Sequence, residues 1–185
     1  YAENFIKENK LKGKLIGIHV GSGKTKNMIL KRWPLKNYII LIKKILKENK
    51  KVSILLFGGP DEEKENKKIL EETKDRRVLL VKTNNIRETA VIIKKCYLFL
   101  SVDNLLMHVA SAVKIPKQIV IAGPTYDFCV APKTKPIVIK SNLECSPCYK
   151  YNGKGVNCIE KEKMKCLKEI TPEMVYDKIK EVLKR

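Results

Sequence analysis

Residues 97–112 read YLFLSVDNLLMHVASA, and this stretch decides the class of fold. Its first part is a short apolar run of the kind that forms a buried strand, and the run ends at Asp103. An amphipathic segment follows at once, with His108 about a turn and a half along it. Asp103 is therefore open to two interpretations. It caps the following helix, as Asp often does, or it lies in a ligand site, because open parallel sheets bind ligands at the carboxyl ends of their strands.

The same pattern of a strand followed by a helix recurs along the chain. Apolar runs predict five further strands, at residues 15–20, 52–57, 78–81, 118–122 and 136–139. Periodic apolar positions predict helices that begin at Pro34, near Asp61, at Ile86 and after an N-cap at Thr171. We expect Ile86 and Met174 on the inner faces of their helices.

Strands that are apolar along nearly all their length and alternate with helices are typical of a parallel α/β sheet. The prediction is a Rossmann-like parallel sheet with helices on both faces and a Cys-rich insert, residues 141–168, before the last helix. Residues 1–14 are rich in Lys, Glu and Asn, and we expect them to be a linker from a preceding N-terminal domain. The Rossmann-like domain itself then spans residues 15–185, a length that can bury a core.

The composition bounds the partners and the compartment. The net charge of +19, from 39 Lys and Arg against 20 Asp and Glu, favours anionic partners such as nucleotides, phosphorylated glycans or an anionic membrane surface. A general bias toward Lys would give the same count. No apolar run approaches the ~18 residues of a membrane span, so we expect a cytoplasmic domain with at most peripheral contact with the inner face of the membrane.

A glycine-rich loop, Gly21-Ser22-Gly23-Lys24-Thr25, follows the first strand. The Walker pattern requires a glycine where this chain has Ile18, so we do not expect a P-loop ATPase. Glycines nevertheless let backbone N–H groups approach a phosphate, and Lys24 supplies positive charge. The loop is therefore a candidate anion-binding site.

The chain has six cysteines. Four of them share the loop-rich insert with the spacing C-x2-C-x9-C-x7-C: Cys145, Cys148, Cys158 and Cys166. This spacing fits a metal site, either structural zinc or an iron–sulfur centre. The alternatives are two disulfides, which are unusual in cytoplasmic enzymes, or free thiols. Cys96 is expected in the core, and Cys129 in the core or a cleft.

Eight features follow one another along the chain: the runs IHVGSG (18–23), KRWP (31–34), LFGGPDE (56–62), IRETAVII (86–93), SVDNLLMHVA (101–110) and GPT (123–125), then the four cysteines of the insert and the run ITPE (170–173). This ordered succession resembles the family-nine glycosyltransferases, the heptosyltransferases of lipopolysaccharide cores. The fifth of these runs corresponds to the family's Asp-Thr-Gly-x-x-His-x-Ala motif. The resemblance covers residues 15–184, which is nearly the whole chain.

The resemblance implies the C-terminal domain of an inverting GT-B enzyme that binds a nucleotide-sugar of the ADP-heptose type. Transfer to a lipopolysaccharide or related glycan would need no cofactor, and a missing N-terminal domain would hold most of the acceptor, so the segment would be inactive alone. The residues implied in donor binding are Gly21, Ser22 and Lys31 at the diphosphate, Asp61 or, preferably, Glu62 at the ribose, Thr83 and Asn84 near the base, Asp103 at the sugar hydroxyls, and the N–H groups of Asn104 and Leu105 at a phosphate.

The chain departs from the family motif at Asn104-Leu105, where the family has Thr-Gly. Glycine allows close approach of a phosphate to the backbone, and Leu105 would crowd it, so either the phosphate lies elsewhere or the donor differs. The family's general base belongs to the N-terminal domain. His108 is therefore a catalytic candidate whose alternative role is a helix residue that bonds a loop.

A second class of function fits the same sequence. A Rossmann module without catalytic activity could bind a nucleotide or RNA, and the basic charge is compatible with it. The aromatic content is 6%, and no strand combines exposed aromatic and basic residues in the way that base stacking requires, so we expect no specific nucleic acid partner.

Overall fold

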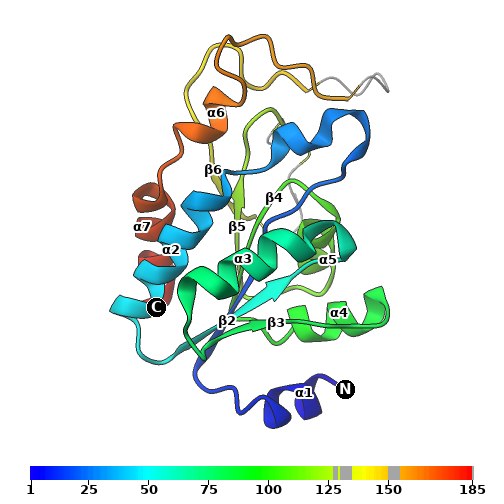
Figure 1. The fold of residues 1–185 in the computed structure, drawn as a ribbon, viewed down its shortest axis with the longest axis vertical. Helices are drawn as coiled ribbons and strands as arrows, with labels where there is room; N and C mark the ends of the chain where they lie inside the picture. Colours follow the sequence, from blue (N-terminus) through cyan, green and yellow to red (C-terminus); the bar gives the residue numbers. More distant parts are fainter. Residues whose placement is uncertain (127–128, 130–134, 150–154, 185) are drawn as a thin grey trace.

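The computed structural model describes residues 1–126, 129, 135–149 and 155–184 (Figure 1). A six-stranded sheet with the strand order β3-β2-β1-β4-β5-β6 runs through it, and every neighbouring pair is parallel. The strands are β1 (Lys14–His19), β2 (Val52–Phe57), β3 (Val78–Leu80), β4 (Leu98–Val102), β5 (Lys117–Ile121) and β6 (Ile137–Ile139). The strand order reverses between β1 and β4, and such a reversal is where open α/β sheets bind ligands.

Helices cover both faces of the sheet. They are α1 (Ala2–Glu8), α2 (Leu35–Glu48), α3 (Glu63–Thr73), α4 (Ile86–Ile93), α5 (Leu105–Ala112), α6 (Lys165–Lys168) and α7 (Pro172–Leu183), with 3₁₀ turns η1 (Thr25–Lys31) and η2 (Pro60–Glu62). One core cluster joins α2, α3 and α7 to the sheet, and a second joins α1, α4 and α5 to it. The predicted Rossmann-like fold with helices on both faces is confirmed.

Alternation of side chains along the strands supplies both cores. In β2, Ile54 and Leu56 belong to the first cluster, and Leu55 and Phe57 to the second. All residues of this strand are buried, which explains why its residues 54–57 form a continuous apolar run rather than an alternating one.

Gly17, at the centre of β1, is required by the packing of the second face. A Cβ atom there would lie 2.6 Å from the Phe99 side chain and 3.0 Å from that of Phe57. The two rings meet edge to face above the glycine, with centroids 5.5 Å apart and an interplanar angle of 62°.

Residues 1–14 differ from the linker that we expected. They contain α1, whose Ala2 is buried in the second core cluster, with Phe5 and Ile6 packed against it. The stretch looks like a linker in the sequence because its polar residues outnumber the apolar ones, but these few apolar side chains find a surface on the domain. The first strand also begins at Lys14 rather than at residue 15.

Two inner-face predictions are wrong. Ile86 is 47% exposed and Met174 is 42% exposed. Both lie in the first turn of a helix, where the chain is still approaching the sheet, so the apolar stripe begins later than the residue pattern indicates. The N-cap prediction at Thr171 is confirmed, because its side chain accepts a hydrogen bond from the Met174 N–H at 3.2 Å.

Candidate functional site

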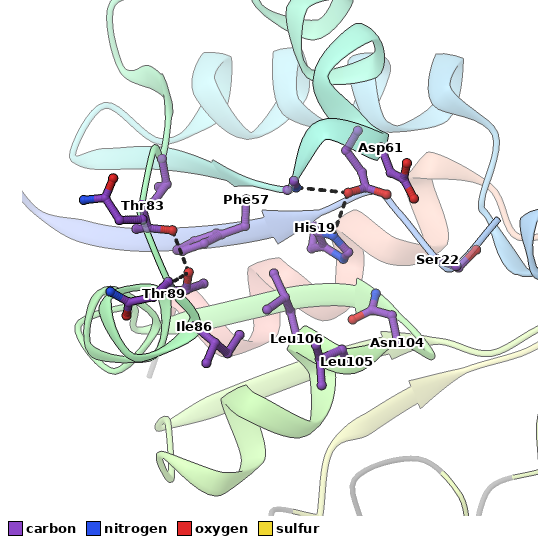
Figure 2. A pocket seen from close by; sticks show the side chains of 17 residues that line it. His19, Ser22, Phe57, Asp61, Thr83, Ile86, Thr89, Asn104, Leu105 and Leu106 are labelled. Carbon is purple, nitrogen blue, oxygen red and sulfur yellow. Dashed lines mark hydrogen bonds and ion pairs between the residues drawn. The ribbon is translucent and has the colours of Figure 1, made fainter. Parts of the chain in front are cut away.

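A pocket of about 390 Å³ opens at the carboxyl ends of β1 and β2, next to the strand-order reversal (Figure 2). Its walls come from the ends of these strands, the segment after β3 and the starts of α4 and α5. The lining residues are His19, Ser22, Gly23, Phe57, Gly58, Gly59, Asp61, Glu62, Val81, Thr83, Asn84, Asn85, Ile86, Thr89, Asn104, Leu105 and Leu106. It combines polar groups with apolar walls, as small-molecule sites do.

The glycine-rich loop is tied to the start of α5. Asn104 caps this helix by accepting the Met107 N–H at 2.9 Å, and its amide donates to the carbonyl of Gly21 at 3.0 Å. The Ser22 hydroxyl donates to the Met28 carbonyl at 2.7 Å, which closes the loop on itself. Asn104, rather than Asp103, is thus the N-cap, so the interpretation of Asp103 as a helix cap is wrong.

Glu62 is held in a buried polar network beneath this loop. Its Oε1 accepts from Arg32 Nη2 at 2.9 Å, and its Oε2 accepts from the Gly59 N–H at 3.1 Å, with His19 Nε2 3.7 Å away. Gly21 packs directly on it, since a Cβ atom there would lie 2.1 Å from Glu62 Oε1. Burial alone raises the pKa of the Glu62 carboxyl, but the neighbouring His19 imidazole, the hydrogen bond from Gly59 and the Arg32 charge together lower it.

Asp103 lies at the end of β4, just beyond the lining of the pocket, and is 8% exposed. Its Oδ2 forms an ion pair with Lys31 and accepts a hydrogen bond from the Thr125 hydroxyl at 2.9 Å. Lys31 is equally buried, and its Nζ lies 5.0 Å from the centroid of the Tyr149 ring. An acid, a base, a hydroxyl and an aromatic ring from four distant segments therefore meet at this strand end.

The structure brings many of the predicted site residues into the pocket lining: Ser22, Asp61, Glu62, Thr83, Asn84, Asn104 and Leu105. The other predicted residues do not line it. Lys24 stands at the mouth, where it pairs with Asp61 at 2.9 Å and remains half exposed. His108 is exposed on α5, and no hydrogen bond or ion pair of it occurs among the described residues.

Sequence reasoning missed several residues of the site. His19 and Phe57 end β1 and β2, and a signal was available, since the last residue of a parallel strand faces the ligand edge. Arg32 had no such signal, because it lies in a loop and reaches Glu62 through tertiary packing. At the mouth, Ile86 and the 67% exposed Leu105 form an apolar rim.

The four cysteines of the insert lie near one another, and no disulfide joins them in the structure. Burial raises the pKa of the Cys166 thiol to about 11, and the nearby sulfurs of Cys148, Cys145 and Cys158 add to this rise. Among the residues that the structure describes, no three His, Cys, Asp or Glu side chains are arranged to hold a metal ion. Cys96 is buried in the second core cluster, as predicted.

The strand order and the position of the pocket define a Rossmann-like α/β domain of the GT-B kind. The structure matches that of ADP-heptose lipopolysaccharide heptosyltransferase II from E. coli with a TM-score of 0.72, 22% identity and coverage of 98% of this chain and 50% of that one. It matches E. coli heptosyltransferase WaaC with ADP with a TM-score of 0.68, 20% identity and coverage of 98% and 48%.

The sequence comparisons identify the family. The model of glycosyltransferase family 9 (heptosyltransferase) matches residues 3–158, so the chain belongs to this family. Lipooligosaccharide heptosyltransferase 2 of Haemophilus influenzae is 28% identical over 161 residues, which cover 83% of this chain and 43% of the relative. The chain thus spans about half the length of the relatives that it matches. Within the described residues, no helix combines the length and apolarity that a membrane crossing needs.

Proposed function

We propose that this chain is the donor-binding part of a heptosyltransferase-type enzyme and that the pocket at the ends of β1 and β2 holds the nucleotide of an ADP-heptose-type donor. The observation that carries the proposal is a pocket with both polar and apolar walls beside the strand-order reversal in a member of glycosyltransferase family 9. The acceptor is a lipopolysaccharide or related glycan, bound mainly by a second domain. Transfer inverts the anomeric centre, needs no cofactor and does not proceed on this chain alone.

The pocket offers distinct surroundings for the parts of a nucleotide. Thr83 and Asn84 lie near the apolar side chain of Ile86, which suits a flat base that needs both hydrogen bonds and an apolar contact. For the ribose hydroxyls, Asp61 is the better-placed carboxylate, because it is half exposed, whereas both oxygens of Glu62 are occupied by Arg32 and Gly59. A carboxylate reads vicinal hydroxyls by accepting their hydrogen bonds.

The remaining groups suit the departure of a nucleoside diphosphate. Negative charge develops on the phosphates as the glycosidic bond to the diphosphate breaks, and preorganised positive groups stabilise it. We assign this role to the N–H groups at the start of α5, at Asn104 and Leu105, and to Lys24 and Lys31. Exposed basic residues, which give the chain its net charge of +19, also suit peripheral contact with an anionic membrane at the cytoplasmic face.

Calorimetric titration of the chain with ADP, GDP and UDP tests the proposal. We expect ADP to bind with a dissociation constant below the millimolar range, because the pocket has a polar base-binding end and a cationic mouth. The Ser22→Trp variant would fill the space beside the glycine-rich loop. Loss of ADP binding in this variant would indicate that the nucleotide occupies that space. Absence of binding for all three nucleotides at millimolar concentration would refute the proposal.

Asp103→Asn separates recognition of the sugar from recognition of the nucleotide. We expect unchanged or tighter ADP binding, because Lys31 loses its carboxylate partner and becomes available to a phosphate. Affinity for ADP-2-deoxy-2-fluoro heptose should fall at least about tenfold, since a charge-assisted hydrogen bond contributes about 1.5–3 kcal/mol.

Asp75→Asn serves as the matched control. Asp75 is also an aspartate paired with a cation, Arg77. It precedes the amino end of β3, whereas the pocket lies at the carboxyl ends of the strands. It should leave both affinities unchanged. Equal losses of ADP and ADP-sugar binding in Asp103→Asn, with an unaltered melting temperature, would contradict a sugar-binding role for Asp103.

We also propose that the four cysteines of the insert act as one cross-linked unit, either as thiolate ligands of zinc or iron or as two disulfides. Sulfur donors suit these metals, and the described parts of residues 140–164 form no helix or strand that would order the segment without a link. We expect fewer than four reactive thiols among them in native protein. A chelator should expose thiols if a metal is bound, and a reductant should do so if disulfides are present.

Cys96→Ala provides the control for this thiol count. Cys96 is buried alone in the second core cluster, so the variant should remove one thiol from the count in denaturant and none from the native count. Elemental analysis of protein purified without added metal completes the measurement. Four freely reactive thiols and no metal would contradict the proposed cross-link.

A further inference from the structure

The Cys-rich insert is seated on the turn that follows β5. The backbone N–H groups of Cys148 and Tyr149 both donate to the Pro124 carbonyl, at 3.0 and 2.8 Å, and the Ser146 hydroxyl donates to the Gly123 carbonyl at 2.6 Å. Two consecutive N–H donors on one carbonyl fix the position of Tyr149 relative to the turn. The insert is therefore part of the sheet's carboxyl edge rather than a loop at the periphery.

A second part of the insert holds the segment that carries Lys31. The N–H of Val156, which is 1% exposed, donates to the Lys26 carbonyl at 3.1 Å. Gly155 beside it has a φ of +80°, and a Cβ atom there would lie 1.8 Å from the Lys26 oxygen, so the contact is possible for glycine alone. The insert thus touches both neighbours of Asp103: the turn that supplies Thr125 and the η1 segment that supplies Lys31.

These contacts converge on a single ammonium group. Lys31 Nζ pairs with Asp103 Oδ2, the oxygen that also accepts the Thr125 hydroxyl, and lies 5.0 Å from the Tyr149 ring centroid. Lys31, Asp103 and Tyr149 are 8%, 8% and 9% exposed. A buried ammonium needs compensation for the water that it loses, and an aromatic face supplies part of it through its quadrupole.

The ring also excludes water from the pair, which strengthens the attraction between Lys31 and Asp103. Without the ring, the flexible four-carbon side chain of lysine can sample other rotamers, and the position of its charge is less defined. The side chain that fixes the cation therefore comes from the insert, more than 100 positions along the chain from Lys31.

We propose that Tyr149 is a positioning residue of the donor site and that it holds the Lys31 ammonium where a donor phosphate and Asp103 can share it. This inference rests on the proposed function, in which Lys31 and Asp103 contact the donor. It assigns the Cys-rich insert a role in donor recognition, since the segment 145–149 sets the position of the ring. Tyr149 itself does not touch the reacting atoms.

The test compares Tyr149→Leu with Tyr149→Phe by calorimetric titration of ADP and ADP-2-deoxy-2-fluoro heptose. Tyr149→Leu should weaken binding of both ligands about tenfold, because it removes the ring that holds Lys31. Tyr149→Phe keeps the ring and should retain affinity within about twofold. The melting temperature of each variant is measured as well. If Tyr149 served packing alone, ligand affinity and melting temperature would change together across these variants.

Tyr97→Leu is the matched control. Tyr97 also places its ring next to a lysine, with Lys14 Nζ 4.1 Å from the centroid, but this pair lies at the amino ends of β1 and β4. The control should lower the melting temperature without changing either dissociation constant. A double-mutant cycle with Lys31→Met adds an independent readout: Tyr149→Leu should have no further effect on ADP affinity once Lys31 is absent.

The outcomes separate the two proposals. If the unmodified chain binds no nucleotide, the proposed function fails before Tyr149 is tested. If the unmodified chain binds both ligands and Tyr149→Leu binds them equally well, the function stands and the role of Tyr149 is refuted. Equal losses in Tyr149→Leu and Tyr149→Phe would also refute it, because the ring would then not be the group that matters.

Discussion

Replacement of Arg32 by methionine should lower the free energy of unfolding by about 3–5 kcal/mol at pH 7, because it leaves a buried carboxylate without its cation. Arg32 is 8% exposed and donates to Glu62 Oε1 at 2.9 Å, to the Ser22 carbonyl at 2.7 Å and to Glu65 Oε1 at 2.9 Å. Glu62 is 6% exposed, so water cannot replace the guanidinium. Urea denaturation of both proteins measures the difference.

The loss should depend on pH. The folded-state pKa of Glu62 is lowered, so its contribution to stability is present above the unfolded value of about 4.3 and disappears as the pH falls through the folded value. The difference between the Arg32→Met variant and the unmodified chain should therefore shrink in acid, where Glu62 is neutral and needs no cation.

An exposed ion pair provides the control. Lys43 pairs with Glu72 at 3.5 Å, and both side chains are about half exposed. Lys43→Met should cost less than about 1 kcal/mol, because water and ions screen such pairs. If Arg32→Met and Lys43→Met cost the same, or if the cost of Arg32→Met does not change with pH, the account of the Glu62 network is wrong.

Trp33→Ala should destabilise the fold by about 3–5 kcal/mol, the cost of removing a large aromatic side chain from a packed core. Trp33 is 2% exposed, and its ring meets that of Tyr38 edge to face, with centroids 4.8 Å apart. The indole N–H donates to the Ile170 carbonyl at 2.8 Å. One side chain thus joins the end of the loop after β1 to the segment that leads into α7.

Trp33→Phe divides this effect into its parts. Phenylalanine keeps much of the ring contact with Tyr38 but cannot donate to Ile170, so about 1–3 kcal/mol should be lost. Hydrogen exchange should show faster opening of α7 in both variants, because Ile170 immediately precedes the Thr171 cap. A cost below about 1 kcal/mol for Trp33→Ala would show that the core closes around the missing ring and that this link is unimportant.

Local sequence patterns were sufficient for the class of fold. A run such as residues 54–57 is apolar at every position because both faces of β2 are covered, and this feature distinguishes a parallel sheet from an exposed antiparallel one. The N-cap Thr171 and the positions of the strand ends were also readable, since they depend on neighbouring residues. The sequence therefore places the glycine-rich loop and the end of β4 at one edge of the sheet.

The partners of the charged side chains were decided by tertiary structure. Nothing near Glu62 in the sequence shows that Arg32 will occupy its Oε1, and nothing near Lys31 shows that Asp103 and Tyr149 will enclose it. The sequence determined which residues stand at the ligand edge, because strand and helix periodicity are set by local backbone geometry. The tertiary structure decided which of these residues pair with one another and which remain available to a ligand. The reason is that a buried charge pairs with the opposite charge that the packing of distant segments brings close to it.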